Sequence, residues 1–390
     1  MQDNENSASR RLGQATFTNL TTFLQGTVSN FQVIPSPTAV GFRSLFGAWF
    51  VDDTIRVRRN LTMQIGLRHE FTTGWNEVAG RAGNWLMDSN GVLITEPRTA
   101  NSAFTTNNAK KLFAPRVSLA WDVFGNGKTA LRGGAALLYD VGTFGSALFL
   151  GVTGTPPFST QSVFTPAAFG PLPAIPASAV GRSLRTVDYH MQQPHLLSYN
   201  LTVERQLPFD LGLTLAYAGS RGMNLMQTKE GNPTVPRGVA QNGVCVAPAS
   251  PVAFSANGPK CWLAGEPRTN PGWDTVDLRT AAGNSWYNSL QASFNKALSR
   301  GFQLQTSYTW SKLIDETQGQ ALGENTAASL FGADPLNNKT DRAVADFDLT
   351  QSLRINTIYD LPKFGMGGVA GKLLDGWRVS SIISLQDGLP

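Results

Sequence analysis

The chain has 390 residues, of which 41% are hydrophobic and only 15% are charged, whereas about a quarter are charged in an average soluble protein. The mean hydropathy of −0.14, together with the lack of any apolar run of about 20 residues, excludes a bundle of membrane helices. The formal charge of +5 comes from scattered lysines and arginines without the basic stretches of a nucleic-acid-binding module, so we expect no nucleic-acid partner.

The chain begins with a segment, 1–39, in which no long strand stands out. We expect a poorly structured lead-in there, with one less regular strand candidate at 23–33. From residue 40 onward, alternating apolar and polar residues predict five strand pairs. The predicted pairs are 44–58 with 61–71, 113–124 with 128–141, 195–207 with 211–221, 285–298 with 301–315, and 346–361 with 376–388.

These ten strands are about twice as long as strands of soluble proteins and long enough to cross a bilayer at a tilt. Four of the five turns within pairs are short, and the fifth is a longer link at 362–376. The short turns are expected at Arg59-Asn60, Asn126-Gly127, Pro208–Asp210 and Ser299-Arg300.

The joints between pairs are much longer than the turns within them. In an antiparallel meander every second joint lies at the same end, so all the long loops are expected at one end of the sheet. Short turns at one end and long loops at the other are typical of outer-membrane barrels. The predicted long loops are 73–112, 142–194, 222–284 and 316–345.

The strand faces differ in chemistry. In the strand at 61–71, Leu, Met, Ile and Phe alternate with Thr, Gln, Arg and Glu. Aromatic residues on the apolar faces lie near both strand ends, where a membrane protein has its two lipid interfaces. The alternative, core and rim aromatics of a soluble sandwich, would concentrate the rings in mid-strand. The predicted aromatic girdle consists of Trp49, Trp121, Tyr139, Trp286, Phe302, Trp310, Tyr359 and Trp377.

Few residues suggest chemistry. Cys245 and Cys261 lie 16 residues apart in the longest loop, and we predict that they form a disulfide; a metal pair is the alternative, although no histidine or third cysteine is near. His190 and His195 could hold a metal, and the acidic stretch 334–348 could hold calcium. In both cases we favour ordinary loop residues without a metal, because two histidines are too few ligands and the acidic spacing does not match an EF-hand.

No P-loop, Gly-x-Ser-x-Gly or zinc-protease motif is present, so we predict no catalytic residue, no cofactor and no metal site. The protein is not expected to be an enzyme. Ligand-binding residues cannot be assigned from the sequence. Five arginines on polar faces could attract an anionic ligand or pair with carboxylates of another domain: Arg68, Arg116, Arg132, Arg354 and Arg378.

Several blocks, in order, resemble the Oar-like branch of the TonB-dependent outer-membrane transporters and receptors. The resemblance implies a 22-stranded barrel, an internal plug and an N-terminal segment that engages TonB. Neither a plug nor a signal-peptide core is evident before residue 40, so we expect this chain to be the middle of a longer protein. The blocks are "WFVDDTIRVRRNLTMQIGLRHEF", "FAPRVSLAWDVFGNGKTALRGGAALLYD", "LSYNLTVERQLPFDLGLTLAYAGSRG", "SWYNSLQASFNKALSRGFQLQTSYTWSKLID", "DFDLTQSLRINTIYDLP" and "LLDGWRVSSIISLQDGLP".

We therefore predict an all-β protein in the bacterial outer membrane. Residues 40–390 are expected to form part of an antiparallel transmembrane β-barrel, contributing 10 or 11 of 22 strands, with short periplasmic turns and long extracellular loops. The expected function is ligand capture by the loops and energised uptake. Its partners would be outer-membrane lipid, an unknown ligand and the TonB complex. The alternatives are a passive porin or surface adhesin barrel, and a secreted all-β carbohydrate-binding or hydrolytic protein.

Overall fold

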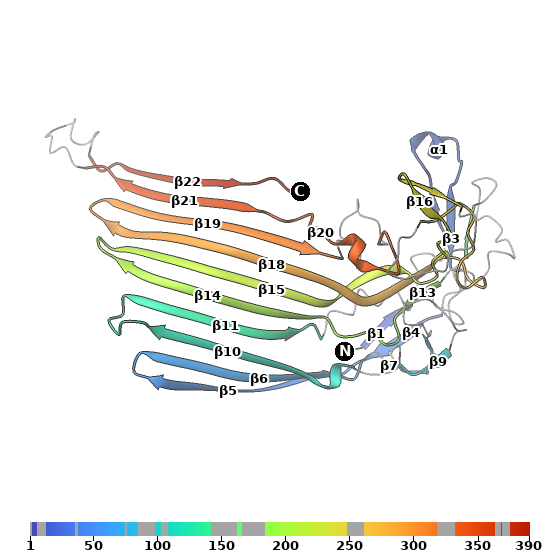
Figure 1. Ribbon diagram of the computed structural model, residues 1–390, viewed down its shortest axis with the longest axis horizontal. Coiled ribbons are helices and arrows are strands. Elements are labelled where there is room, and N and C mark those ends of the chain that lie inside the picture. Colours follow the sequence, from blue (N-terminus) through green and yellow to red (C-terminus); the bar gives the residue numbers. More distant parts are fainter. Residues whose placement is uncertain are drawn as a thin grey trace.

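The computed structural model describes residues 2–5, 13–35, 38–74, 76–84, 98–102, 108–141, 162–165, 184–247, 261–317, 332–362, 368 and 375–390. Its main element is a 12-stranded sheet that contains ten long strands in the order β22-β21-β19-β18-β15-β14-β11-β10-β6-β5 (Figure 1). The ten are β5 (Phe46–Arg58), β6 (Leu61–Thr72), β10 (Leu112–Asp122), β11 (Thr129–Tyr139), β14 (His195–Leu207), β15 (Leu211–Glu230), β18 (Val276–Ser299), β19 (Phe302–Asp315), β21 (Gln351–Asp360) and β22 (Arg378–Gln386). The prediction of ten long strands is confirmed.

Each long strand pairs antiparallel with the next one along the chain. The short turns consequently gather at the left end in Figure 1, and the long joints lie at the right. The turn predicted at Ser299-Arg300 lies one residue later. Arg300 and Gly301 have φ angles of 52° and 77°, and a two-residue hairpin turn whose twist matches its strands needs positive φ at both central residues.

The turn between β10 and β11 is built around the side chain of Asp122. Its carboxylate accepts hydrogen bonds from the backbone N–H of Gly125 at 3.1 Å and of Gly127 at 2.7 Å. Both glycines have positive φ, 68° and 72°, a region that other residues rarely occupy. The predicted Asn126-Gly127 turn therefore lies inside a longer, side-chain-stabilised turn.

Two strands, β15 and β18, continue far beyond their predicted ends. β15 runs for 20 residues and β18 for 24, so both ends of the segment predicted as a loop over 222–284 are strand instead. The ladder continues through register shifts between Gly222 and Met226, where Asn224 has a φ of 52°. Such a bulge breaks the alternation of side chains, which is why period-two patterning ends near residue 221.

The lead-in is more structured than expected. The strand candidate at 23–33 shortens to β3 (Asn30–Val33), because residues 20–24 form the helix α1 (Leu20–Leu24), capped by the side chain of Asn19. β3 lies outside the large sheet, between β2 (Gln14–Thr16) and β12 (Ser162–Phe164).

Further short strands lie among the long joints. β13 and β20 add to the large sheet beside β18 and β19, and the others form small sheets, β1-β4-β7, β8-β9 and β16-β17. None of the helices within the described ranges is long and apolar enough to cross a membrane. The remaining elements are β1 (Gln2–Glu5), β4 (Val40–Arg43), β7 (Asn76–Glu77), β8 (Ala82–Asn84), β9 (Arg98–Ala100), β13 (Leu184–Val187), β16 (Val239–Gln241), β17 (Val244–Val246), β20 (Ala343–Val344), and the 3-10 helices η1 (Asn108–Lys110) and η3 (Asn338–Asp341).

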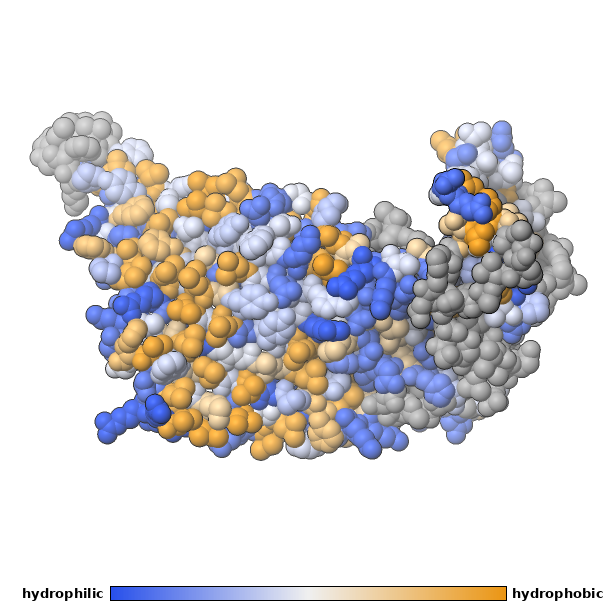
Figure 2. All heavy atoms as spheres, in the orientation of Figure 1, coloured by the Kyte–Doolittle hydropathy of each residue, from blue (hydrophilic) through white to orange (hydrophobic). Residues whose placement is uncertain are grey.

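The buried hydrophobic residues lie mostly outside the long hairpins. One cluster contains Phe42 and Met191, a second contains Trp273 and Leu278, and a third surrounds Phe31. Many apolar residues of the long strands are exposed, and Figure 2 shows hydrophobic side chains gathered over the middle of the sheet. A soluble sandwich would bury that face, so the sheet has the burial pattern of a single membrane wall with a packed loop assembly at one end.

Candidate functional site

The register of the ladder separates one apolar face from one polar face. Across β6, β10 and β11, Ile65, Val117 and Ala135 lie opposite one another and point to one side. Their chain neighbours Gln64 and Ser118 point to the other side. Because every long strand continues this alternation, a polar wall runs across the sheet.

The predicted girdle residues follow the apolar face. Those near the short turns are Trp121, Phe302, Tyr359 and Trp377; those near the long joints are Trp49, Tyr139, Trp286 and Trp310. Trp310 is 56% exposed and Trp377 is 60% exposed, as rings facing lipid would be. Their role at the two membrane interfaces stays a prediction.

The five arginines of the polar face divide into two groups. Three of them have a carboxylate partner. Within the part of the chain that the structure describes, Arg116 and Arg354 form no ion pair, and both are exposed. The paired ones are Arg68 with Glu70 at 2.8 Å, Arg132 with Glu204 at 3.1 Å and Arg378 with Asp360. Register places both of these guanidinium groups on the polar face of the sheet.

A shallow cavity of about 300 Å³ lies beside Arg116. Small residues line part of it, and a Cβ at Gly134 would come within 3.1 Å of the Val117 carbonyl oxygen. The polar side chains around it can donate several hydrogen bonds to a ligand. Its lining is Gln64, Arg116, Val117, Ser118, Gly134, Ala135, Ala136, Ser198 and Asn200.

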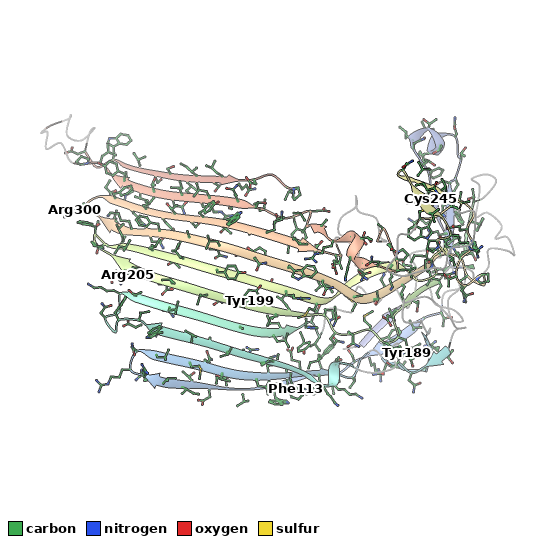
Figure 3. All side chains as sticks on the ribbon, in the orientation of Figure 1. Phe113, Tyr189, Tyr199, Arg205, Cys245 and Arg300 are labelled. Atoms are coloured by element: carbon green, nitrogen blue, oxygen red, sulfur yellow. A yellow bond between two sulfur atoms is a disulfide. The ribbon has the colours of Figure 1, made fainter. Side chains whose placement is uncertain are left out.

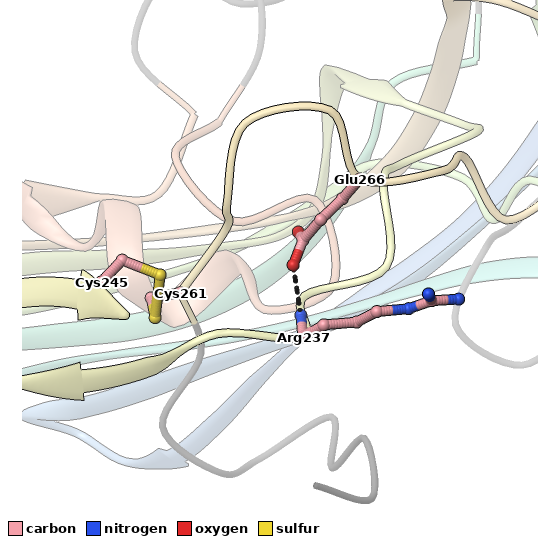
Figure 4. The surroundings of a disulfide bond; sticks show 4 residues. All are labelled: Arg237, Cys245, Cys261 and Glu266. Carbon is pink, nitrogen blue, oxygen red and sulfur yellow. Dashed lines mark hydrogen bonds between the residues drawn. A yellow bond between two sulfur atoms is a disulfide. The ribbon is translucent and has the colours of Figure 1, made fainter. Parts of the chain in front are cut away.

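The cysteines lie in the loop assembly, at the end opposite Arg205 and Arg300 (Figure 3). Cys245 and Cys261 are joined by a disulfide, with their Cα atoms 5.6 Å apart. Both sulfur atoms lie close to Gly238, where a Cβ would come within 2.3 Å of one of them. Figure 4 shows the hydrogen bond that the Arg237 backbone N–H donates nearby to the Glu266 carboxylate, at 2.8 Å.

Two of the three histidines have a backbone carbonyl group beside the ring. His69 Nε2 lies 2.9 Å from the Lys110 carbonyl oxygen, and His195 Nδ1 lies 3.0 Å from the Gln193 carbonyl oxygen. Among the residues whose positions are described, no three His, Cys, Asp or Glu side chains gather as a metal site requires.

Two buried polar residues, Asn232 and Glu77, organise the loop assembly. Asn232 is fully buried, and its amide nitrogen lies 2.9 Å from the carbonyl oxygens of Asn270 and Trp273. Its Oδ1 accepts the Asn270 backbone N–H at 2.8 Å. The adjacent Glu230 forms an ion pair with Arg268 at 3.1 Å. Sequence reasoning missed both Asn232 and Glu230, because they lie where the alternating pattern has ended.

Glu77 is the second organiser, and its side chain is completely buried. Its two oxygens accept backbone hydrogen bonds from Gly41, Ala79 and Arg81, and the Arg81 guanidinium donates a further one at 3.0 Å. Burial by itself raises the pKa of this carboxyl, but the N–H donors outweigh it, so the pKa of Glu77 lies below its usual value.

This pKa predicts acid sensitivity of the small sheet β1-β4-β7. The folded pKa is below the unfolded value of about 4.3, so the stabilisation by Glu77 is complete above that value and is lost as the pH falls through the folded pKa. We expect amide exchange over 40–43 and 76–81, corrected for the intrinsic rate, to stay constant from neutral pH down to about 4.3 and to accelerate below it. In Glu77→Gln, protection should be lower throughout and lack this acid step. An identical acid step in Glu77→Gln would assign the effect to other groups.

The fold and the two faces together define a class. A ten-stranded antiparallel meander with an apolar face, a polar face, short turns at one end and long loops at the other is the wall of a transmembrane β-barrel. The chain belongs to the outer membrane beta barrel domain family, whose model matches residues 1–390. It is thus a protein of the bacterial outer membrane.

Among solved structures, the outer membrane transporter YddB from Escherichia coli is similar over 92% of this chain and 47% of its own, with 10% identity and a TM-score of 0.44. The alcaligin receptor FauA from Bordetella pertussis matches over 92% and 40%, with 12% identity and a TM-score of 0.38. The siderophore receptor PirA from Acinetobacter baumannii matches over 89% and 39%, with 8% identity and a TM-score of 0.36. This chain spans less than half of each. No curated protein matches it.

Asn288 forms a polar cluster with two tyrosines on the lipid face. Asn288 Oδ1 accepts hydrogen bonds from the hydroxyl groups of Tyr217 at 2.6 Å and of Tyr199 at 3.1 Å. These bonds satisfy an amide oxygen that lipid cannot. We expect Tyr217→Phe to lower the free energy of unfolding by about 1 kcal/mol, measured by urea unfolding of the intact protein in lipid vesicles. In an Asn288→Leu background the same change should cost almost nothing. Equal costs in both backgrounds would show that the two side chains are not coupled.

Proposed function

We propose that this chain forms part of the wall of a TonB-dependent receptor, which captures a ligand with its extracellular loops and takes it up with energy supplied through TonB. The ordered blocks that resemble the Oar-like branch support the energised mechanism. The polar wall, with its cavity and the unpaired Arg116, is the observation that best supports passage of a polar or anionic ligand along the sheet.

The wall is proposed to belong to a larger barrel. Among the described strands, β5 and β22 each have a long-strand partner on one side only, and the sheet does not close. An unpaired strand edge in lipid leaves N–H and C=O groups without partners, each at a cost of several kcal/mol. We therefore propose that further strands of the same protein complete the barrel.

The intact mass of the polypeptide recovered from isolated outer membranes tests closure. A mass well above the 42.0 kDa of this chain supports the larger barrel. A mass of 42.0 kDa in the same fraction would contradict it and require β5 to pair with β22.

Uptake by the source organism tests the energised mechanism. Cells with and without this gene are supplied in turn with ferric chelates, oligosaccharides and peptides, with TonB intact or disrupted. We expect one ligand class whose uptake needs both this gene and TonB. Uptake that needs the gene but not TonB would favour a passive porin, and ion conductance of the purified protein in a bilayer would show it directly.

A further inference from the structure

Trp286 holds two arginines against its indole ring. The Arg342 guanidinium lies 4.1 Å from the ring centroid and the Arg221 guanidinium 5.5 Å from it. Arg221 is the cross-strand partner of Trp286 in the ladder between β15 and β18. Arg342 comes from a different part of the chain, between η3 and β20. Two distant segments thus bring positive charge to one aromatic residue.

The register places this cluster on the lipid side of the sheet. Trp286 shares its face with Leu290, which is 47% exposed, and with Tyr217, because side chains two and four residues apart point the same way. It also lies toward the long loops, at the level of the outer aromatic girdle. The predicted girdle puts Arg221 and Arg342 at the boundary between the acyl chains and the headgroups of the outer leaflet.

No carboxylate in the described ranges neutralises the two arginines. Neither Arg221 nor Arg342 forms an ion pair there, and both are exposed. The ladder places Asp315 opposite Ser285, next to Trp286 in the chain but on the other face of the sheet. Asp315 is buried, as is Glu316, which accepts a hydrogen bond from Asn284 at 2.8 Å. Lys312 is a further exposed cation on this face. Continuing the register of β19 with β20 puts Asp346 opposite it, so we leave Lys312 out of the site.

We propose that Arg221 and Arg342, held by Trp286, bind the phosphate group of an anionic lipid in the outer leaflet. A guanidinium donates two parallel hydrogen bonds to phosphate oxygens, and such bonds strengthen where water is scarce. The indole ring holds both cations on one side of the barrel wall, and the exposed apolar side chains below them contact the acyl chains. The site is independent of the transported ligand and of TonB.

Native mass spectrometry of the intact protein in detergent tests the site. The probes are phosphatidylglycerol and diacylglycerol with the same acyl chains, which differ in the phosphate headgroup. We expect a complex of the protein with phosphatidylglycerol that persists when diacylglycerol is added in excess. The double variant Arg221→Gln/Arg342→Gln should weaken its binding at least about tenfold, through the loss of charge-assisted hydrogen bonds. The matched control, Arg56→Gln/Arg237→Gln, removes the same charge from the polar face of β5 and from the loop assembly, and should bind as the wild type does.

Three outcomes would overturn the proposal. They are equal binding by the double variant and the wild type, equal retention of diacylglycerol, and complete displacement of the lipid by excess inorganic phosphate, which would indicate a site for free phosphate. If the double variant does not fold, Arg221→Lys/Arg342→Lys retains the charge. It should bind phosphatidylglycerol more weakly than the wild type, because lysine lacks the paired donors of arginine. Unweakened binding by this lysine variant would contradict the paired-donor geometry.

Discussion

Asn232→Ala is expected to open the segment between β15 and β18 while leaving the membrane strands intact. The substitution leaves the Trp273 carbonyl and the Asn270 backbone N–H without this partner, whereas the Asn270 carbonyl keeps the bond from the Trp273 N–H. Each such group costs about 1–3 kcal/mol, so we expect local destabilisation of about 3 kcal/mol. Amide exchange in 231–247 and 261–275 should then rise roughly 150-fold, measured by mass spectrometry on the intact protein.

Gln241→Ala is the control, because Gln241 lies on β16 in the same loop assembly and its side chain is exposed. Its exchange rates should equal those of the wild type. Asn232→Asp keeps the acceptor oxygen but removes the amide donor and adds a charge near Glu230, so it should open the segment as well. Wild-type exchange in Asn232→Ala would mean that the disulfide Cys245–Cys261 and the packing of Trp273 suffice to hold the segment.

The membrane wall could be predicted because its physics is local and repetitive. Alternation with period two identifies a strand and its faces together, and positive-φ residues such as Gly127 and Gly301 mark the turns. Once neighbouring hairpins are placed side by side, ion pairs such as Arg132 with Glu204 follow from the register, although 72 residues separate the two. Strand length and the sorting of short turns and long loops to opposite ends indicated a membrane barrel, and the resemblance to a known family added the energised mechanism.

The loop assembly could not be predicted in this way. Glu77 and Asn232 act through backbone groups that only the folded chain brings near them. No periodic pattern marks such residues, because single buried polar side chains hold the loops where a strand would use a repeated series of apolar residues. The same holds for Arg342, whose approach to Trp286 depends on the short pairing of β20 with β19. The strand expected at 23–33 shortened because Asn19 caps a helix before it.

Leu290→Arg should destabilise the protein by about 2–4 kcal/mol, whereas Gln291→Arg should cost about 1 kcal/mol or less. The two residues are adjacent in the middle of β18, and the alternation of the strand turns Leu290 toward lipid and Gln291 toward the polar wall. An arginine on the lipid side loses its hydration, while one on the polar side stays in contact with water. Urea unfolding of both variants in lipid vesicles gives the two costs.

This pair tests the orientation of the sheet independently of any transported ligand. The two positions are adjacent on one strand and receive the same charge, so the difference in cost reports the medium on each face. If Gln291→Arg were the more harmful change, the polar face would be the one turned toward lipid. Equal and small costs would mean that both faces are in water, and the wall would then not cross a membrane. A large difference in the expected direction places the exposed Trp310, the cross-strand partner of Leu290, in lipid as well.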